Sequence, residues 1–393
     1  MKTKILFIMS SLRNGGAERS LVNLLQLFDY QKYEVDLLLF QEEGIFLEQL
    51  PNEVHILHDC DILHLLYAKG NNRIKGIKHP LLTFDHYWGT FWARKKTESM
   101  YASRQYRWEH YYKDRIPSIE TKKYDVAISY LHGEQLYYLV DKVDAKKKIA
   151  WIHTDYSKLN ALEEYDLKYM RQVDSVVSIS NICVETLCKT FPSIKEKFCM
   201  LPNLTSSSSI KYLAEKECPK EYGGDEFKIV SVGRLIHLKG FDMAIDAASI
   251  LKENGLKFSW FILGDGELKT ELNMQIKNKN VDDCVFLLGA TDNPYKYMDG
   301  ADILVQTSRY EGKSVVLDEA KILGKPIVVT NYDTVKDQVN DNEGVIVNMS
   351  SEAIAAGIMK IIPRIDEIQT YLNAYEYGNQ DEIYKYYQLI GNI

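Results

Sequence analysis

The sequence lacks the marks of metal-binding, secreted and membrane-spanning proteins. Its 393 residues include six cysteines, none in a C-x-x-C pair and none beside a histidine set, which argues against a structural zinc site. Scattered cysteines are typical of reduced thiols in a cytoplasmic protein. No run approaches the roughly 18 uncharged apolar residues of a spanning helix. The apolar start, Ile5 to Met9, is shorter than the about 7–15 residues of a signal-peptide core and indicates a buried strand.

The overall composition is that of a globular protein. The hydrophobic content is 46%, within the range of about 45–50% of ordinary domains, so a disordered or fibrous protein is not expected. The length predicts about two to three domains.

Short apolar runs alternate with helical segments in the first half of the chain. Runs rich in Ile, Val and Leu lie at residues 4–9, 34–40, 124–130, 148–152 and 174–179. Continuous runs of this kind indicate a parallel sheet buried on both faces. We therefore predict a first doubly wound α/β domain over residues 1–204.

A second series follows a polar segment, 205–226, whose Ser-rich and Gly-Gly stretches predict a linker. From Phe241 to Leu251, apolar residues recur at the spacing of a helix packed on a sheet. We predict a second α/β domain over 227–375, facing the first across a cleft. A C-terminal helix, about 376–393, is expected to cross back onto the first domain. The second series of apolar runs lies at 227–232, 258–263, 284–288, 301–306, 326–330 and 343–347.

Ligands of open α/β sheets bind beyond the carboxyl ends of the strands, so the loops there are candidate sites. The first such loop contains Gly15 and Gly16 and leads into a helix from Ala17. Glycine lets the backbone approach a ligand closely, and a helix start offers N–H groups and a positive dipole end to an anion. The spacing is not G-x-G-x-x-G, so a dinucleotide fingerprint is absent.

Two basic residues follow the first strand of the second series. In VGRLIHLKGFD, Arg234 and Lys239 lie in the loop and at the start of the next helix. Guanidinium and ammonium groups there suit a pyrophosphate that leaves as an anion. Taken alone, this segment is also explained if Arg234 and Lys239 are solvated surface charges beside a glycine turn.

The segment TSRYEGKSVVLDEAKILGKP has the most specific pattern, two glutamates eight residues apart. After a strand, its loop carries Glu311 and Gly312, and a helix is predicted from about Ser314 to Leu323. Glu311 suits sugar hydroxyls, and Glu319 suits two hydrogen bonds from a ribose diol. The backbone N–H groups expected to point outward and hold phosphate oxygens belong to Lys313, Ser314 and Val315.

Together, and each at a strand end, these loops resemble the retaining glycosyltransferases of family 4, which have two facing Rossmann-like domains (the GT-B fold). The resemblance covers nearly the whole chain, through GGAER, GRLIHLKG, ILGDGEL and EGKSVVLDE. It implies transfer of a hexose or N-acetylhexosamine from a nucleotide diphosphate sugar to a lipid-linked, glycan or polymer acceptor. UDP is the expected base because it is frequent in that family. The resemblance implies no metal and no other cofactor.

The resemblance also implies a role for each site residue. By that resemblance, the loop with Gly15 and Gly16 faces the leaving diphosphate, and Arg234 and Lys239 hold the diphosphate. Glu311 orients the donor sugar, and Glu319 binds the ribose. Stabilising the departing charge in this way is often the largest catalytic contribution.

His153, in WIHTD after a strand, matches the histidine that touches the transferred sugar in that family, although local turn contacts explain it equally well. One departure from the family pattern follows Glu311. Lys313 and Ser314 stand where an aromatic residue and then Gly or Pro are usual. The identity of the donor sugar therefore stays open.

Other classes of protein share some of these features. Asp59-Cys60-Asp61 matches the Asp-x-Asp pair of single-domain, metal-dependent glycosyltransferases, but the chain has its own cationic phosphate loop, so no metal is predicted. A sugar-nucleotide 2-epimerase has the same fold and needs no acceptor. A phosphorylase would need a pyridoxal-bearing lysine, and none stands out. A membrane-bound, non-catalytic protein that binds sugar nucleotides is the non-enzyme alternative.

The net charge of −7 hides a basic, aromatic window at residues 62–123, with thirteen Lys/Arg, five Asp/Glu and eleven aromatic residues. Its net charge is thus +8, and the rest of the chain carries −15. Basic residues and Trp or Tyr both favour an anionic bilayer surface. The window predicts peripheral binding to the inner face of the cell membrane. A solvated basic face over core aromatics is the alternative, and no nucleic-acid module accompanies the charge.

Overall fold

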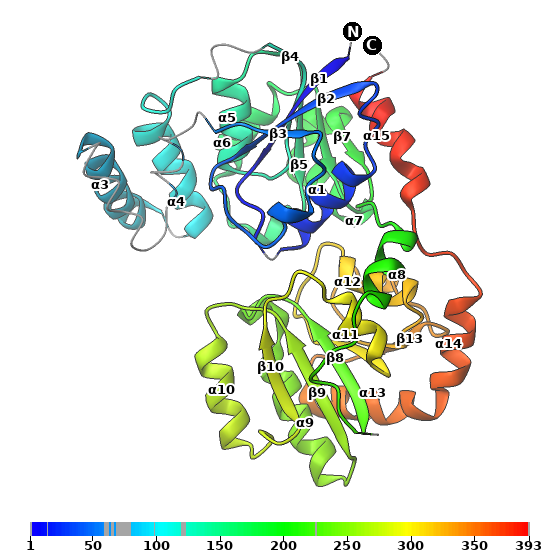
Figure 1. Cartoon of the computed structure of the whole chain (residues 1–393). Helices are drawn as coiled ribbons and strands as arrows, with labels where there is room; N and C mark the ends of the chain where they lie inside the picture. Colours follow the sequence, from blue (N-terminus) through cyan, green and yellow to red (C-terminus); the bar gives the residue numbers. More distant parts are fainter. Residues whose placement is uncertain are drawn as a thin grey trace. The chain divides into compact units, whose positions relative to one another are not determined.

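The computed structural model describes residues 2–13, 15–58, 63, 67, 80–97, 99–118, 123–224 and 226–391. The chain divides into two compact units, shown in Figure 1. The first comprises residues 1–13, 17–203 and 382–393, and the second comprises residues 14–16 and 204–381.

The first unit contains a seven-stranded parallel sheet in the order β3-β2-β1-β4-β5-β6-β7. The central strands are almost wholly apolar and buried, as a sheet covered on both faces requires. The strands are β1 (Thr3–Met9), β2 (Tyr33–Leu39), β3 (Val54–Ile56), β4 (Tyr124–Ser129), β5 (Ala145–Ile152), β6 (Ser175–Ser178) and β7 (Phe198–Met200).

Helices connect these strands, and two of the helices, α3 and α4, lie at the margin of the unit. Figure 1 shows α3 at the outer edge, with α4 on the side toward the sheet. A π-helical turn, η3 (Trp108–Tyr112), continues α4 and also packs against α3. The α-helices of this unit are α1 (Gly16–Gln26), α3 (Pro80–Lys96), α4 (Met100–Arg107), α5 (Glu134–Lys142), α6 (Glu163–Met170), α7 (Asn181–Thr190) and α15 (Ile383–Ile390).

The second unit contains a six-stranded parallel sheet in the order β10-β9-β8-β11-β12-β13. Its strands are β8 (Phe227–Val232), β9 (Phe258–Leu263), β10 (Val285–Gly289), β11 (Ile303–Gln306), β12 (Ile327–Thr330) and β13 (Gly344–Val347).

Successive residues of β8 enter different cores, because side chains alternate across a strand. Ile229 packs with apolar residues of α9 and α13, whereas Val230 packs with those of α8, α11 and α12. Helices thus cover both faces of the sheet. The α-helices are α8 (Ser207–Glu215), α9 (Phe241–Glu253), α10 (Lys269–Asn278), α11 (Tyr295–Gly300), α12 (Val315–Ile322), α13 (Ser351–Ile361) and α14 (Ile365–Asn373).

The predicted fold class, α/β with two Rossmann-like domains, is confirmed. All eleven apolar runs named above form strands, with ends displaced by at most three residues. The strands β3 and β7 were not predicted. Each has three residues and lies at a sheet edge, so neither carries the long apolar run of a central strand.

The segment 205–226, predicted as a linker, contains helix α8 and belongs to the second unit. Ser206 caps the helix by accepting a hydrogen bond from the Ser209 N–H, and Ile210 and Ala214 are buried in the second unit's core. Serine is favoured at a helix N-cap as well as in loops. The polar composition of the segment therefore led to the wrong prediction of a linker.

The C-terminal helix α15 belongs to the first unit. The Tyr387 ring stacks on Tyr33 with centroids 5.1 Å apart, and the Tyr386 ring stacks on Trp151 at 5.7 Å. The Tyr386 hydroxyl donates to the Pro202 carbonyl at 2.7 Å. The end of the chain thus returns to the sheet formed by its beginning.

Candidate functional site

The second sheet brings together two loops that are distant in sequence. Strands β8 and β11 are neighbours at the point where the strand order reverses. The helices that follow on either side leave a crevice at such a switch point, where α/β sheets bind ligands. The loop 233–240 follows β8, and the loop 307–314 follows β11.

Glycines allow these loops to pack closely. A Cβ on Gly240, which has φ +65°, would lie 2.1 Å from the Thr307 carbonyl oxygen. A Cβ on Gly264, with φ +148°, would lie 1.8 Å from the Gly233 carbonyl oxygen. Only glycine fits at either position. The ILGDGEL segment therefore supports the 233–240 loop.

Lys239 and Glu311 join the two loops directly. Lys239 Nζ lies 2.5 Å from Glu311 Oε1, and the two side chains are only 20% and 15% exposed. Thr307 Oγ1 also donates to the Lys239 carbonyl at 2.9 Å. The predicted phosphate-binding cation and the predicted sugar-orienting carboxylate are thus an ion pair.

Further hydrogen bonds hold the Glu311 carboxylate. Its Oε1 accepts from Ser308 Oγ at 2.7 Å and from Gln306 Nε2 at 3.2 Å. Its backbone carbonyl accepts from Thr334 Oγ1 at 3.0 Å. The carboxylate is therefore positioned by both β11 and its loop before any ligand binds.

The two arginines of these loops have different roles. Arg234 is exposed and makes no ion pair with any described residue. The two terminal guanidinium nitrogens of Arg309 donate to the two carboxylate oxygens of Asp242 at 2.8 and 2.5 Å. Arg309 also donates to the His237 carbonyl. Arg309 thus ties the loops together, whereas Arg234 is available to an anion.

The start of α12 differs from the expectation in one respect. The Ser314 N–H, predicted to be available to a phosphate, donates to Gln338 Oε1 at 2.9 Å, and Ser314 is buried. That part of the prediction is wrong, because a side chain from the segment after β12 already occupies the N–H. Lys313 Nζ pairs with Asp318 Oδ2 at 3.1 Å. Gly312 and Val315, which flank them, are also buried.

Glu319 lies inside α12 and is 3% exposed. Its Oε1 accepts a hydrogen bond from the Tyr295 hydroxyl of α11 at 2.8 Å. A buried carboxylate needs such partners, since desolvation disfavours the ion. The Tyr295 hydroxyl thus fixes the orientation of the Glu319 carboxylate.

The predicted residues of the first half lie at strand ends. Gly15 and Gly16 follow β1, with Gly16 opening α1. His153 follows β5, and its ring centroid lies 4.8 Å from that of Tyr130. The structure thus places these residues after β1 and β5, as predicted from the sequence.

A second histidine, His132, accompanies His153. The last paired residues of β4 and β5 are Ser129 and Ala150, and each histidine lies three residues beyond its strand's member of that pair. Both nitrogens of His153 and Nδ1 of His132 are buried without a hydrogen-bond partner among the described residues. Burial, with the neighbouring His132, lowers the pKa of His153 to about 3, and burial lowers the pKa of His132 to about 4.

The basic, aromatic window is divided by the structure. Trp108 is fully buried and donates to Asp141 Oδ2 at 3.0 Å, while Arg107 lies 3.8 Å from Glu134 and over the Tyr112 ring. The window predicted to bind a membrane thus includes two residues, Trp108 and Arg107, that serve the core of the first unit instead. The window residues outside the described part include Lys69, Arg73, Lys75 and Lys78.

Within the described residues, no group of three His, Cys, Asp or Glu side chains is arranged to hold a metal ion. Asp59 and Asp61 lie outside those residues. No helix in the described part of the chain has the length and apolar content needed to cross a membrane.

Residues 215–380 match the family model of glycosyl transferases group 1. The match lies within the second unit and spans less than half of the chain. A glycosyltransferase of Methanocaldococcus jannaschii is 30% identical over 183 residues, which span 46% of this chain and 44% of that protein. The alignment thus covers less than half the length of that relative.

A longer alignment relates the chain to an N-acetylgalactosaminyltransferase of Campylobacter jejuni, named for a diphospho-undecaprenol substrate. It is 26% identical over 353 residues, 89% of this chain and 87% of that protein. Among solved structures, Staphylococcus aureus TarM, in complex with UDP and glycan ligands, superposes with a TM-score of 0.66 over 100% of both chains at 16% identity. The GT-B fold therefore extends beyond the segment that the family model matches.

Sequence reasoning missed several residues that hold the site together. These include Tyr295, Ser308, Arg309 and Gln338. Hydroxyl, amide and guanidinium groups occur throughout the chain, so no local pattern marked them. Only Ser308 and Arg309, three and two residues before Glu311, lay close enough in sequence to be noticed.

Proposed function

We propose that this protein is a glycosyltransferase that moves a hexose or N-acetylhexosamine from a nucleotide diphosphate sugar to a lipid-linked or polymeric acceptor. The observation that carries the proposal is the Lys239–Glu311 pair at the switch point of the sheet, within the segment that matches the glycosyl transferases group 1 model. Arg234, which forms no ion pair with a described residue, lies in the same loop. Cations and a carboxylate there suit a leaving diphosphate and a sugar hydroxyl.

In this proposal each side chain has one task. Lys239 has three N–H donors and uses one on Glu311, so the others can bind a phosphate while the carboxylate stays oriented toward the donor sugar. Arg234 binds the same diphosphate, and Glu319 binds the ribose. Because negative charge grows on the diphosphate as the glycosidic bond breaks, the two cations stabilise the transition state more than the bound donor.

The proposed roles in the first half of the chain are those of substrate contact. Gly15 and Gly16 let the backbone and the N-terminus of α1 approach the diphosphate. His153 contacts the transferred sugar. Both of its ring nitrogens lack partners among the described residues, and a neutral imidazole offers one donor and one acceptor to hydroxyl groups.

The donor and acceptor are proposed from the relatives. TarM binds UDP, which supports a UDP-sugar as donor. The Campylobacter enzyme is named for an undecaprenol-linked substrate, and a Staphylococcus aureus relative, 32% identical over 143 residues, is named for poly(ribitol-phosphate). These names support a lipid-linked or polymeric acceptor, and we propose on that ground that the protein acts at the inner face of the membrane.

We further propose that transfer retains the anomeric configuration and needs no divalent metal. In this proposal Arg234 and Lys239 offset the diphosphate charge, the task that a divalent metal would otherwise perform. Turnover is expected to survive excess EDTA, and proton NMR of the product is expected to show the donor's anomeric configuration. Loss of activity in EDTA with recovery in manganese would overturn metal independence and redirect attention to Asp59 and Asp61.

The deciding experiment incubates the protein with UDP-, GDP- and ADP-sugars, without acceptor and then with undecaprenyl-diphosphate glycans. Slow hydrolysis of one donor, accelerated by the acceptor with formation of a glycosylated lipid, is expected. Isomerisation of the donor sugar would identify a 2-epimerase instead. Binding without either reaction would identify a non-catalytic protein. A nucleotide at about a hundredfold its Kd should stabilise the protein by about 2.7 kcal/mol, which a thermal-shift screen detects.

A further inference from the structure

Helix α3 carries a row of exposed apolar side chains on one face. Leu81, Phe84, Trp88 and Phe91 are 67%, 58%, 46% and 58% exposed. Their spacing of three, four and three residues places them in a single stripe along the helix. Large apolar side chains exposed together in this way mark an interaction surface more often than those exposed singly.

The opposite face anchors α3 to the first unit. A Cβ on Gly89 would lie 2.9 Å from the Tyr111 ring, and Ala93 is fully buried. His86 Nδ1 lies 3.0 Å from the Tyr112 hydroxyl. The helix is therefore held by one face, and the apolar stripe is presented by the other.

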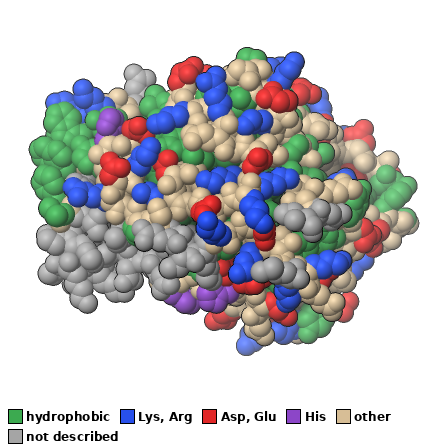
Figure 2. All heavy atoms as spheres, turned by 90° about the horizontal axis from the view of Figure 1, so that it is seen from above, with side chains coloured by type: hydrophobic (Ala, Val, Ile, Leu, Met, Phe, Trp, Pro, Cys, Tyr) green, Lys and Arg blue, Asp and Glu red, His purple; other side chains and the backbone are tan. Residues whose placement is uncertain are grey.

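The aromatic rings of the stripe form a continuous ridge. Phe84 and Trp88 stack with centroids 5.7 Å apart at 15°, and Trp88 and Phe91 lie 6.1 Å apart at 28°. Figure 2 shows apolar side chains gathered at the end of the first unit where Figure 1 places α3, with basic side chains beside them.

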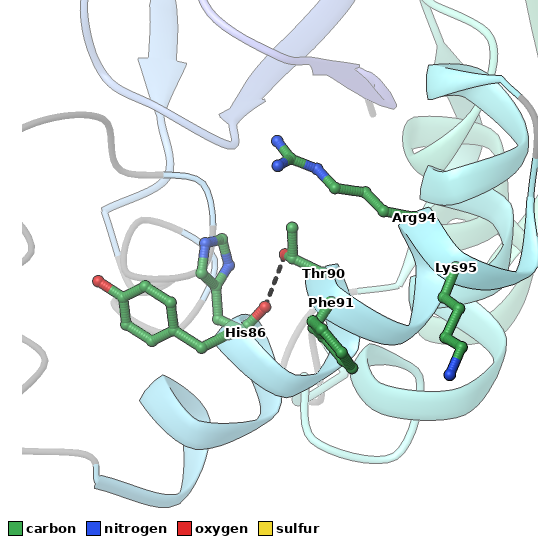
Figure 3. Close-up of a pocket in the computed structure, with 6 residues that line it drawn as sticks. His86, Thr90, Phe91, Arg94 and Lys95 are labelled. Atoms are coloured by element: carbon green, nitrogen blue, oxygen red, sulfur yellow. Dashed lines mark hydrogen bonds between the residues drawn. The ribbon is translucent and has the colours of Figure 1, made fainter.

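Three cations end the same helix. Arg94, Lys95 and Lys96 are exposed, and none forms an ion pair with a described residue. Figure 3 shows Phe91 and Lys95 pointing to the same side of the helix, with Arg94 on another side. A recess of about 530 Å³ is lined by His86, Tyr87, Thr90, Phe91, Arg94 and Lys95. Phe91 and Lys95 thus share one side of the helix, and Arg94 lines the same recess.

The distribution of charge along the chain indicates which partner binds the exposed face of α3. The segment 80–118, which forms α3, α4 and η3, contains seven Lys/Arg and four Asp/Glu, a net charge of +3, and the rest of the chain carries −10. An anionic surface therefore attracts this segment and repels the rest of the chain. A second copy would instead bring two cationic helix ends into the same interface. An acidic protein would satisfy the cations, but Trp and cations at the rim of an apolar stripe are the combination that bilayer interfaces favour.

We propose that α3 docks on an anionic lipid bilayer. Leu81, Phe84, Trp88 and Phe91 enter the interfacial region, and the cations at the end of the helix pair with headgroup phosphates. Each cation near an anionic leaflet contributes about 1 kcal/mol, about fivefold in partitioning, so three contribute about a hundredfold. The inference deepens the proposed function, on which it rests for its biological purpose, because it holds the enzyme on the surface that contains a lipid-linked acceptor.

Vesicle flotation tests the proposal with the full-length protein. Vesicles contain phosphatidylcholine alone or with about a third phosphatidylglycerol, at low and high salt, since screening weakens exposed charges. The parent is expected to float with anionic vesicles at low salt and to stay at the bottom with neutral ones. One variant carries Phe84→Ser, Trp88→Ser and Phe91→Ser, and another carries Arg94→Glu, Lys95→Glu and Lys96→Glu.

Each α3 variant is expected to lose at least about tenfold in vesicle partitioning and to keep the parent's thermal stability and UDP affinity. The matched control, Met274→Ser with Lys277→Glu on the exposed part of α10, should float like the parent. Equal flotation by the α3 variants and the parent would overturn the proposal. Concentration-dependent dimerisation of the parent, abolished in the variants, with no flotation, would also overturn it and identify a second copy as the occupant.

Failure of docking and failure of the proposed function give different results. A parent that floats but neither binds UDP nor transfers sugar retains the docking surface and loses the enzymatic role. A parent that transfers sugar to a soluble acceptor analogue but never floats loses only the docking surface. If both proposals hold, the α3 variants should transfer sugar to the soluble analogue normally and lose activity only on vesicle-bound acceptor.

Discussion

Lys239 Nζ lies 2.5 Å from Glu311 Oε1, although the two residues follow different strands and are 72 positions apart in sequence. The pair is mostly shielded from water, which strengthens an electrostatic interaction. A cation and a carboxylate that act as one unit should not have independent effects on catalysis.

The first prediction follows from this pair. Lys239→Ala and Glu311→Ala should each lower kcat by about 10²–10³, the usual effect of removing one preorganised electrostatic group. Their combination should lower kcat little further, because the second change removes an interaction that the first has already broken. Steady-state kinetics of the two single variants and the double variant measure this. Additive losses, or a rise in KM alone, would contradict it.

The second prediction separates Arg234 from Arg309. Arg234→Ala should lower kcat more than it raises KM and should leave stability within about 0.5 kcal/mol of the parent, since an exposed, unpaired side chain contributes little to folding. Arg309→Ala should cost about 1 kcal/mol of stability, because it breaks the two-pronged bond to Asp242. Thermal denaturation and kinetics of both variants provide the comparison. Equal destabilisation by the two would show that Arg234 is a structural residue.

The third prediction concerns the Glu319 carboxylate. Glu319→Ala should weaken UDP binding about ten- to a hundredfold, because two charge-assisted bonds to the ribose, worth roughly 1.5–3 kcal/mol each, are partly replaced by water. Tyr295→Phe, which removes only the hydroxyl that donates to Glu319, should have a smaller effect. Titration calorimetry measures both. Unchanged UDP affinity in Glu319→Ala would remove the residue from the nucleotide site.

The fourth prediction is a loss of stability in mild acid. His132 and His153 have folded pKa values of about 4 and about 3, below the unfolded value of about 6.5. The unfolded chain therefore binds protons first as the pH falls, and stability present above about pH 6.5 is lost toward pH 4. At about 1.4 kcal/mol per pKa unit, each histidine costs roughly 3 kcal/mol by about pH 4.

Urea denaturation at pH 7.5 and near pH 4.5 tests the histidine prediction against a His132→Gln, His153→Gln double variant. Glutamine occupies a similar place but does not titrate in this range, so the variant should lose less stability than the parent between the two pH values. An equal loss in both proteins would assign the acid sensitivity to carboxylates elsewhere.

Much of the architecture could be read from local patterns. Apolar runs such as 227–232 and 258–263 coincide with β8 and β9 in full, because a strand buried on both faces must be apolar throughout. The helix Phe241–Glu253 followed from its stripe. The short edge strands and α8 could not be predicted, since three residues carry little signal and serine serves both loops and helix caps.

The sequence by itself determined the two α/β domains, the loops in which Arg234, Lys239 and Glu311 lie and the helix that contains Glu319, because apolar runs and strand ends are local properties of the chain. Only the tertiary structure decided which of these groups meet. Strand order, which no local pattern encodes, made β8 and β11 neighbours and so paired Lys239 with Glu311. Packing likewise buried Trp108 and exposed Trp88 within one aromatic window, since burial depends on what lies against each helix face.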